Sequence, residues 1–238
     1  MKLIAHRGAS LERPENSLES LEYGSELGAF AVECDVRMTA DGVYIIFHDD
    51  RLERLGGDPR AVDRVTFDEL RAILSARGKR VLTLDELFAY RGRAAVLLHI
   101  KLPHPDAAFF ERLTGSGIDF ICGMTSVEMT GIGHSFFPPN RILAFMETIH
   151  DRESCQLLAR QYHTAGAGII RLWEQWLDFV TPDDIRKVCP YCEVYIMANS
   201  PRGGMNGNLE SLIRMKSLHA DGVLLNDIRL GIESIGRL

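Results

Sequence analysis

The chain has 238 residues, of which 46% are hydrophobic, and this length suits one domain with a sizeable core. A formal net charge of −6 provides no basic surface for nucleic acid or an anionic membrane, so we expect neither as a partner. The segment Met1–Ala5 is too short for a signal peptide, and no apolar run approaches the ~20 residues that cross a bilayer. We therefore expect no stable membrane insertion.

Short apolar runs alternate with segments of helical spacing along the chain. Eight runs have the character of strands, at Lys2–Ala5, Ala31–Val36, Ala95–Ile100, Asp119–Cys122, Arg141–Phe145, Gly168–Leu172, Glu193–Ala198 and Gly222–Leu225. Intervening segments carry helical spacing and start signals, at Ser17–Leu27, Asp106–Leu113, Ser154–Ala165, Pro182–Val188 and Leu209–Leu218. This alternation predicts an α/β protein with a (β/α)8 TIM barrel, whose chemistry lies at the carboxyl ends of the strands.

Between the second and third predicted strands the pattern changes. Val43–Phe47 is an extended apolar run that ends at His48, and Thr66–Leu70 and Thr83–Phe88 look like short helix starts. We expect a small insertion around residues 49–90 within a single barrel domain that spans residues 1–238.

Four polar residues follow these early apolar runs. His6 and His48 each end an extended segment, and histidine is the side chain best placed to act as acid or base near neutral pH. Glu33 and Asp35 share one face of a strand with Cα atoms about 6.5 Å apart, and two oxygen ligands so placed suit Mg²⁺ or Ca²⁺. Each residue alone could be structural, but their combination predicts a site that holds a cation and moves protons.

The residues around His6, Glu33, Asp35 and His48 resemble, in order and spacing, the glycerophosphodiester phosphodiesterase family. That family carries the motifs HRG, PEN(S/T), E-x-D-V, T-x-D-G and HD in this order. The chain reads HRGAS, PENS and GAFAVECDVRMTADGVYIIFHDD. An ordered match of this length is far more specific than one short motif. The resemblance implies metal ligands at Glu33 and Asp35, an acid–base pair at His6 and His48, a phosphate contact at Arg7, and a small-molecule phosphodiester as substrate.

The third predicted strand departs from the family, which has I-E-I-K or L-N-I-E-L-K there and so carries a further metal-binding glutamate and a phosphate-binding lysine. Aligned on the lysine, His99 replaces the glutamate; aligned on the flanking L-x-I pattern, Lys101 replaces it and Pro103 replaces the lysine. Strand alternation points His99 and Lys101 inward in both registers. A neutral His99 could bind a metal and would favour Mn²⁺ or Zn²⁺ over Ca²⁺, whereas Lys101 would pair with the carboxylates and supply charge to a phosphate.

Other polar residues follow the later predicted strands, at Glu147, Arg171, Trp173, Glu174 and Asn199. Loop polarity explains each of them at least as well as a function does. Arg171, at a strand end beside two tryptophans, is the one that we expect to be a second anion contact. Glu15 could support the site residues or start a helix, and the helix start is favoured. The glycine-rich segment 202–208 lies where barrels often bind phosphate, but a flexible loop is favoured. Ala220–Asp227 resembles the family's V-D-G-I-I-T-D, with Asn226 at the aspartate.

Cys189-Pro190-Tyr191-Cys192 is also the redox motif of glutaredoxins, where it opens a helix that lowers the thiol pKa. Here it follows a predicted helix and precedes a strand, so we expect it at the end of the barrel opposite the chemistry and disfavour a redox role. The other cysteines are scattered. Five cysteines without a disulfide framework favour a reducing cytoplasm.

Three functions are compatible with these residues. The chain could be a metal-assisted phosphodiesterase acting on a glycerol- or sugar-containing diester, or a related enzyme in which His99 or Lys101 rebuilds the metal site. It could also be a catalytically silent barrel that binds a phosphorylated ligand. Retention of both histidines together with both carboxylates favours an enzyme.

Overall fold

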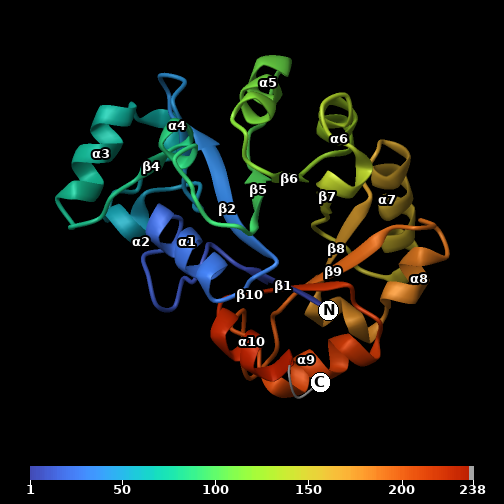
Figure 1. Ribbon diagram of the computed structural model, residues 1–238. Helices are drawn as coiled ribbons and strands as arrows, with labels where there is room; N and C mark the ends of the chain where they lie inside the picture. The colour runs from blue at the N-terminus through green and yellow to red at the C-terminus, as the bar shows by residue number, and fades with distance from the viewer. Residues whose placement is uncertain (236–238) are drawn as a thin grey trace.

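The computed structural model describes residues 1–235, and Figure 1 shows a ring of strands surrounded by helices. Within these residues, eight parallel strands form a closed barrel in which β1 pairs with both β10 and β2. The barrel strands are β1 (Lys2–Ala5), β2 (Ala31–Met38), β5 (Ala95–Ile100), β6 (Phe120–Met124), β7 (Ile142–Phe145), β8 (Ile169–Trp173), β9 (Glu193–Met197) and β10 (Gly222–Leu225). The (β/α)8 barrel predicted from the sequence is confirmed.

Helices cover the outside of the barrel, namely α1 (Leu18–Glu26), α5 (Ala107–Gly115), α6 (Val127–His134), α7 (Arg152–Thr164), α8 (Pro182–Arg186), α9 (Leu209–Ser217) and α10 (Ile228–Ile235). Side-chain oxygens cap several of their amino ends. Ser17, Asp106 and Asn208, for example, each accept a hydrogen bond from the backbone N–H three residues on. Such caps satisfy backbone donors that have no partner inside the helix, which explains why the start signals were informative.

Two of these helices, α6 and α10, were not predicted from the sequence. α6 contains Gly131 and Gly133, and glycine weakens both helix propensity and the apolar stripe that marks a helix. Short 3₁₀ turns at Pro139–Arg141 and Glu174–Asp178 add to the connections. None of the helices within residues 1–235 combines the length and apolar character needed to traverse a bilayer.

The segment after β2 forms a small subassembly beside the barrel, made of β3 (Tyr44–Ile46), α2 (Glu53–Gly56), a 3₁₀ turn (Val62–Arg64), α3 (Phe67–Ser75), β4 (Leu82–Thr83) and α4 (Leu84–Leu87). β3 runs antiparallel to the end of β2, with Val36 opposite Ile46. The segment has its own apolar cluster, which includes Ile45, Leu52 and Leu70. His48 therefore lies at the end of an extended segment, as expected, and this segment is a hairpin strand outside the eight barrel strands.

The alternation of side chains along the strands divides the barrel into two layers. Ala31, Leu97 and Leu143 pack in the interior cluster, whereas Cys34 and Leu98 belong to the larger cluster between the strands and the helices. Residues with the parity of Ala31 on β2 consequently face the interior. This parity directs Glu33 and Asp35 into the barrel, toward the carboxyl end of β2.

Cys189 and Cys192 lie between α8 and the start of β9, with the backbone N–H of Cys192 donating to the carbonyl of Cys189. This position is at the amino end of a barrel strand, so the prediction that the motif lies opposite the mouth is confirmed. All five cysteines of the chain are free and buried in the structure.

Candidate active site

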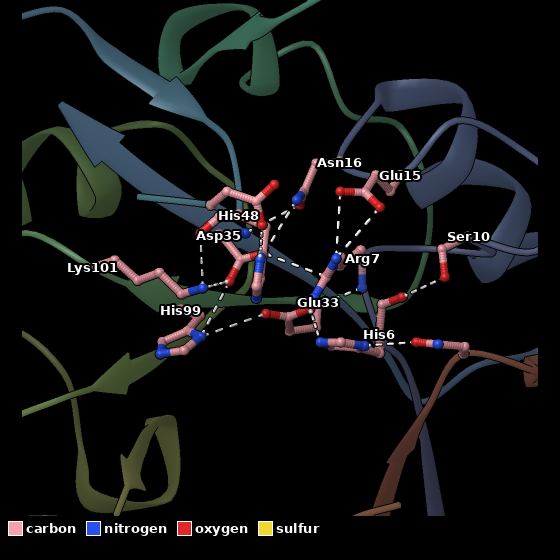
Figure 2. A network of polar contacts seen from close by, with 12 residues as sticks. His6, Arg7, Ser10, Glu15, Asn16, Glu33, Asp35, His48, His99 and Lys101 are labelled. Atoms are coloured by element: carbon pink, nitrogen blue, oxygen red, sulfur yellow. Dashed lines mark hydrogen bonds and ion pairs between the residues drawn. The ribbon is translucent and has the colours of Figure 1, made fainter. Parts of the chain in front are cut away.

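Glu33 and Asp35 form the centre of a polar network at the mouth of the barrel (Figure 2). Both carboxylates are almost fully buried, with exposed fractions of 1% and 0%. Oε2 of Glu33 accepts a hydrogen bond of 2.8 Å from the backbone N–H of Arg7. Asn16 holds Asp35 twice, since its Nδ2 donates to Oδ2 at 3.1 Å and its Oδ1 accepts from the Asp35 backbone N–H at 3.2 Å. Asn16 belongs to the PENS motif, but no role was predicted for it from the sequence.

His99 lies beside both carboxylates. Its Nδ1 is 3.2 Å from Oδ1 of Asp35 and 3.9 Å from Oε1 of Glu33, and β5 places it opposite Asp35 in the sheet register. Among the described residues, neither of these two buried oxygens has a partner that satisfies hydrogen-bond geometry. One possible metal-ligand atom from each of the three side chains lies within 4.8 Å of the others. Two carboxylates and an imidazole converging in this way fit a divalent cation.

Lys101, the first residue after β5, enters the same site with the inward parity of His99. Its Nζ lies 2.8 Å from Oδ1 of Asp35 and donates a hydrogen bond of 3.0 Å to the carbonyl of His48. The prediction that Lys101 points into the same mouth as Glu33 and Asp35 is confirmed (Figure 2). An ammonium group therefore already balances one charge of the carboxylate pair.

Burial and neighbouring charges separate the two carboxylates. Burial, followed by the charge of Asp35, raises the pKa of Glu33. Burial opposes ionisation of Asp35 as well, but contact with His99 and the charge of Lys101 hold its pKa well below the usual value. Burial also lowers the pKa of His99 to about 4, so its imidazole is neutral near pH 7 and keeps a lone pair for a metal.

His6 is held by a hydrogen bond of 2.7 Å between its Nδ1 and Oδ1 of Asn226. Nδ2 of Asn226 donates to Oδ1 of Asn206, so the amide oxygen faces His6, and Nδ1 of His6 carries the proton. Its Nε2 is 3.9 Å from Oε2 of Glu33. Burial, reinforced by the charge of Arg7, lowers the pKa of His6 to about 3. Near neutral pH His6 thus presents an unprotonated Nε2 to the mouth.

His48 reaches the mouth because β3 runs back along the end of β2. Its Nδ1 lies 2.7 Å from Oδ1 of Asp49, and Arg54 donates to the other oxygen of that carboxylate at 2.6 Å. Nε of Arg37 donates to the His48 carbonyl at 3.0 Å. Burial lowers the pKa of His48, while Asp35 and Asp49 counteract this. The carboxylate orients the ring with Nδ1 protonated and leaves Nε2 free.

Arg7 adds a cation on the other side of Asp35. Its Nε lies 4.0 Å from Oδ2 of Asp35 and, among the described residues, has no hydrogen-bond acceptor. Nη1 contacts Glu15 at 3.4 Å, and Nη1 of Arg54 also donates to Glu15 at 3.1 Å. The expectation that Glu15 starts a helix is wrong, because α1 begins at Leu18 after a Ser17 cap and Glu15 instead ties Arg7 to Arg54.

The sharp turn after His6 depends on Gly8. Its φ is +76°, and a Cβ built there would lie 2.4 Å from Oγ of Ser20, so no other residue fits without a shift. The turn brings Arg7 beside Asp35, and Arg7 itself has a φ of 58°.

The polar residues at the ends of β7, β8 and β9 form two separate sets of contacts. Arg171 is buried on β8, and its Nη2 lies 2.5 Å from Oε1 of Glu147, whose other oxygen accepts from Nε1 of Trp173. Glu174 accepts a hydrogen bond from the backbone N–H of Asn199 at 2.8 Å and so joins the loops after β8 and β9. Glu174 and Asn199 thus have a structural contact with each other.

Comparisons with known proteins identify the family of this chain. The sequence model of the glycerophosphoryl diester phosphodiesterase family matches residues 6–124, half of the chain, and the chain belongs to this family. The match includes His6, Glu33, Asp35, His48 and Lys101.

Individual relatives match shorter stretches. A glycerophosphodiester phosphodiesterase from Caldanaerobacter subterraneus subsp. tengcongensis is 32% identical over 107 residues, which are 42% of this chain and 44% of the relative. Glycerophosphodiester phosphodiesterase 1 from Bos taurus is 35% identical over 78 residues, 33% of this chain and 24% of the relative. The chain spans about half the length of the first curated relatives that it matches.

Solved structures resemble the whole fold. A glycerophosphodiester phosphodiesterase from Thermotoga maritima has a TM-score of 0.74 and 20% identity, covering 97% of this chain and 96% of its own. An Oleispira antarctica phosphodiesterase in complex with the product sn-glycerol-3-phosphate has a TM-score of 0.72 and 17% identity, covering 99% and 97%. At these identities the similarity supports the barrel fold.

Proposed function

We propose that this chain hydrolyses a glycerophosphodiester to a phosphomonoester and an alcohol. One observation carries the proposal: two imidazoles, His6 and His48, each with Nδ1 fixed by a partner, flank the buried pair Glu33 and Asp35 (Figure 2). General acid–base catalysis needs two such groups around a reacting phosphorus. Membership of the family and the relatives named as glycerophosphodiester phosphodiesterases support the same reaction.

Glu33, Asp35 and His99 would hold a divalent cation, which supplies Lewis-acid charge to a phosphate oxygen when it is bound. Oxygen ligands alone would favour Mg²⁺ or Ca²⁺, whereas the imidazole makes Mn²⁺ or Zn²⁺ a better match. Arg7 and Lys101 carry positive charges beside Asp35 and would bind the remaining phosphate oxygens.

The histidines differ in their surroundings, and this difference suggests distinct roles. His6, neutral with a free Nε2, would take a proton from the attacking water as the new O–P bond forms. His48 would act in its imidazolium form, paired with the Asp49 carboxylate through Nδ1, and would give its Nε2 proton to the leaving alcohol oxygen as the old P–O bond breaks. One O–P bond forms and one breaks, and after the step His6 carries the proton that water lost while His48 has lost its own. Proton exchange with solvent restores both rings before the next turnover.

Metal analysis of the purified chain, followed by incubation with a panel of glycerophosphodiesters and detection by phosphorus NMR, tests this function. We expect a bound divalent metal and conversion of at least one diester to a phosphomonoester signal. A chain that binds the diesters but converts none of them, with or without added metal, would contradict the proposal.

The ion pair between Lys101 and Asp35 favours a second candidate function, in which the barrel binds a phosphorylated ligand without a metal. In that case the ammonium takes the role of the cation. Tight binding of sn-glycerol 3-phosphate in excess chelator, with no turnover, is the result that this candidate requires.

We also propose a cytoplasmic location. The five buried cysteines form no disulfide in the described chain, which suits a reducing compartment. Fractionation of cells that express the full-length protein tests this, and recovery of the protein outside the cytoplasm would contradict it.

A further inference from the structure

Arg171 is a charged residue enclosed in the barrel without a full set of acceptors. Only 1% of its surface is exposed, and it extends from β8 with the parity of the interior residue Ile169. Among the described residues, its Nε and Nη1 have no hydrogen-bond partner. A buried guanidinium with unmade hydrogen bonds is costly, because the charge has lost water without gaining acceptors in return.

Aromatic rings surround the guanidinium. Its Cζ lies 4.5 Å from the ring centroid of Trp173 and 5.0 Å from that of Phe145. These cation–π contacts stabilise the positive charge and fix the plane of the guanidinium. The ring faces do not, however, accept hydrogen bonds from the N–H groups that lie in that plane. Arg171 is therefore positioned in advance, with donors still available.

Within residues 1–235, the carboxylate that pairs with Arg171 comes from the surface. The Glu147 side chain, which is 56% exposed on the loop after β7, reaches Nη2 of Arg171 at 2.5 Å and also accepts from Nε1 of Trp173. An exposed side chain can turn into solvent at little cost. An incoming anion could thus take the place of Glu147 and also reach the unpaired donors.

Phe145 connects this group to the candidate active site. Its ring stacks on His99 with 3.7 Å between centroids, and Gly123 leaves the room for it, because a Cβ at that position would lie 2.3 Å from the ring. Phe145 contacts both His99 and the guanidinium of Arg171. An anion on Arg171 would therefore be close to, but separate from, a phosphate held by Arg7 and Lys101.

We propose that Arg171 forms a subsite for a second anionic group of the substrate, a carboxylate or a further phosphate outside the diester that is cleaved, and that Glu147 occupies this subsite until substrate enters. The proposal rests on the phosphodiesterase function above. It names the substrate class as glycerophosphodiesters whose second half bears a negative charge.

Two matched substrates test it, the phosphodiesters of glycerol with glycerol and with glyceric acid, which differ by a carboxylate in place of a hydroxymethyl group. For the wild type we expect kcat/KM to be about tenfold higher for the glyceric acid diester, as for one charged hydrogen-bonded contact. Arg171→Gln should abolish this preference and change kcat/KM for the neutral diester only a few-fold. Arg112→Gln, on the outer surface of α5, serves as the matched charge control and should keep the preference.

Glu147→Gln provides a test that does not depend on the folding of an Arg171 variant. Removal of the competing carboxylate should increase the preference for the anionic diester. If the wild type cleaves neither of these two diesters, the diester panel decides the proposed function, and dissociation constants for the two diesters, measured by calorimetry, decide the subsite separately. Equal kcat/KM or binding for the two diesters in the wild type, or an equal loss for both in Arg171→Gln, would overturn the proposal.

Discussion

The ammonium of Lys101 lies 2.8 Å from Oδ1 of Asp35, on the carboxylate that faces the centre of the candidate active site. Unit charges ~4 Å apart interact by roughly 4 kcal/mol at an effective dielectric of ~20, so this contact matters to any cation that approaches Asp35. The same oxygen is 3.2 Å from Nδ1 of His99. His99 and Lys101, the two residues that could stand in place of the family's glutamate, therefore act on one oxygen, with opposite consequences for metal binding.

The first prediction concerns Lys101. Lys101→Met should strengthen Mn²⁺ binding by about tenfold or more, because a positive charge beside the carboxylate is removed. It should at the same time raise KM for the diester, since a phosphate contact is lost. Calorimetric titration with Mn²⁺ measures the first effect, with the exposed Lys79→Met as the charge control. An unchanged Mn²⁺ affinity would mean that Lys101 does not oppose the cation.

The second prediction concerns the identity of the third ligand. His99→Glu should improve binding of Mg²⁺ and Ca²⁺ relative to Zn²⁺, because a carboxylate oxygen replaces an imidazole nitrogen. His99→Ala should weaken the binding of all these ions. Titration of the two variants with each ion gives the comparison. If neither variant changes any affinity, β5 contributes no ligand to the metal site.

The third prediction concerns the support of Asp35. Asn16→Gly removes both hydrogen bonds to Asp35 but keeps a residue that tolerates the φ of 56° at this position. We expect a loss of about 1–3 kcal/mol in the free energy of unfolding, measured in urea. Thr148→Gly is the matched control, because Thr148 has a φ of 55° and is exposed. Equal effects of the two substitutions would show that the Asn16 side chain contributes little.

The fourth prediction concerns the packing of Phe145 on His99. Gly123→Ala places a Cβ against the Phe145 ring and should destabilise the fold by about 1–3 kcal/mol while displacing the ring from His99. Gly131→Ala, in α6 with nothing within 4 Å of the new Cβ, should instead stabilise by about 0.5–1 kcal/mol. Thermal unfolding of both variants gives the sign of each effect. Stabilisation by Gly123→Ala would show that the ring moves at no cost.

The barrel fold, and which side chains of β2 and β5 point into it, could be predicted from the sequence. Alternation along β2 and β5 is a local property, so Glu33, Asp35, His99 and Lys101 could be assigned to one face before their positions were known. Parallel register then brings them together without further information. α6 was missed because its two glycines weaken the helical signal.

Long-range partners were harder to predict. Asn226 holds His6 across 220 positions of sequence, and Arg54 joins Glu15 to Asp49 through a hairpin whose path the sequence does not specify. Glu15 was assigned to a helix start because such residues are common there. In the sequence, Asn226 was notable only because it stands where the family has an aspartate. That difference did not predict its hydrogen bond with His6.

Turnover by two histidine variants is the sharpest test of the proposed acid–base pair. We predict that His6→Ala and His48→Ala each lower kcat for the best glycerophosphodiester by roughly 10²-fold or more, as expected when an acid–base group is lost, with thermal unfolding close to that of the wild type. His163→Ala, near the end of α7 and away from the mouth, should retain full activity. Activity of either site variant within a few-fold of the wild type would contradict the proposed acid–base roles of His6 and His48.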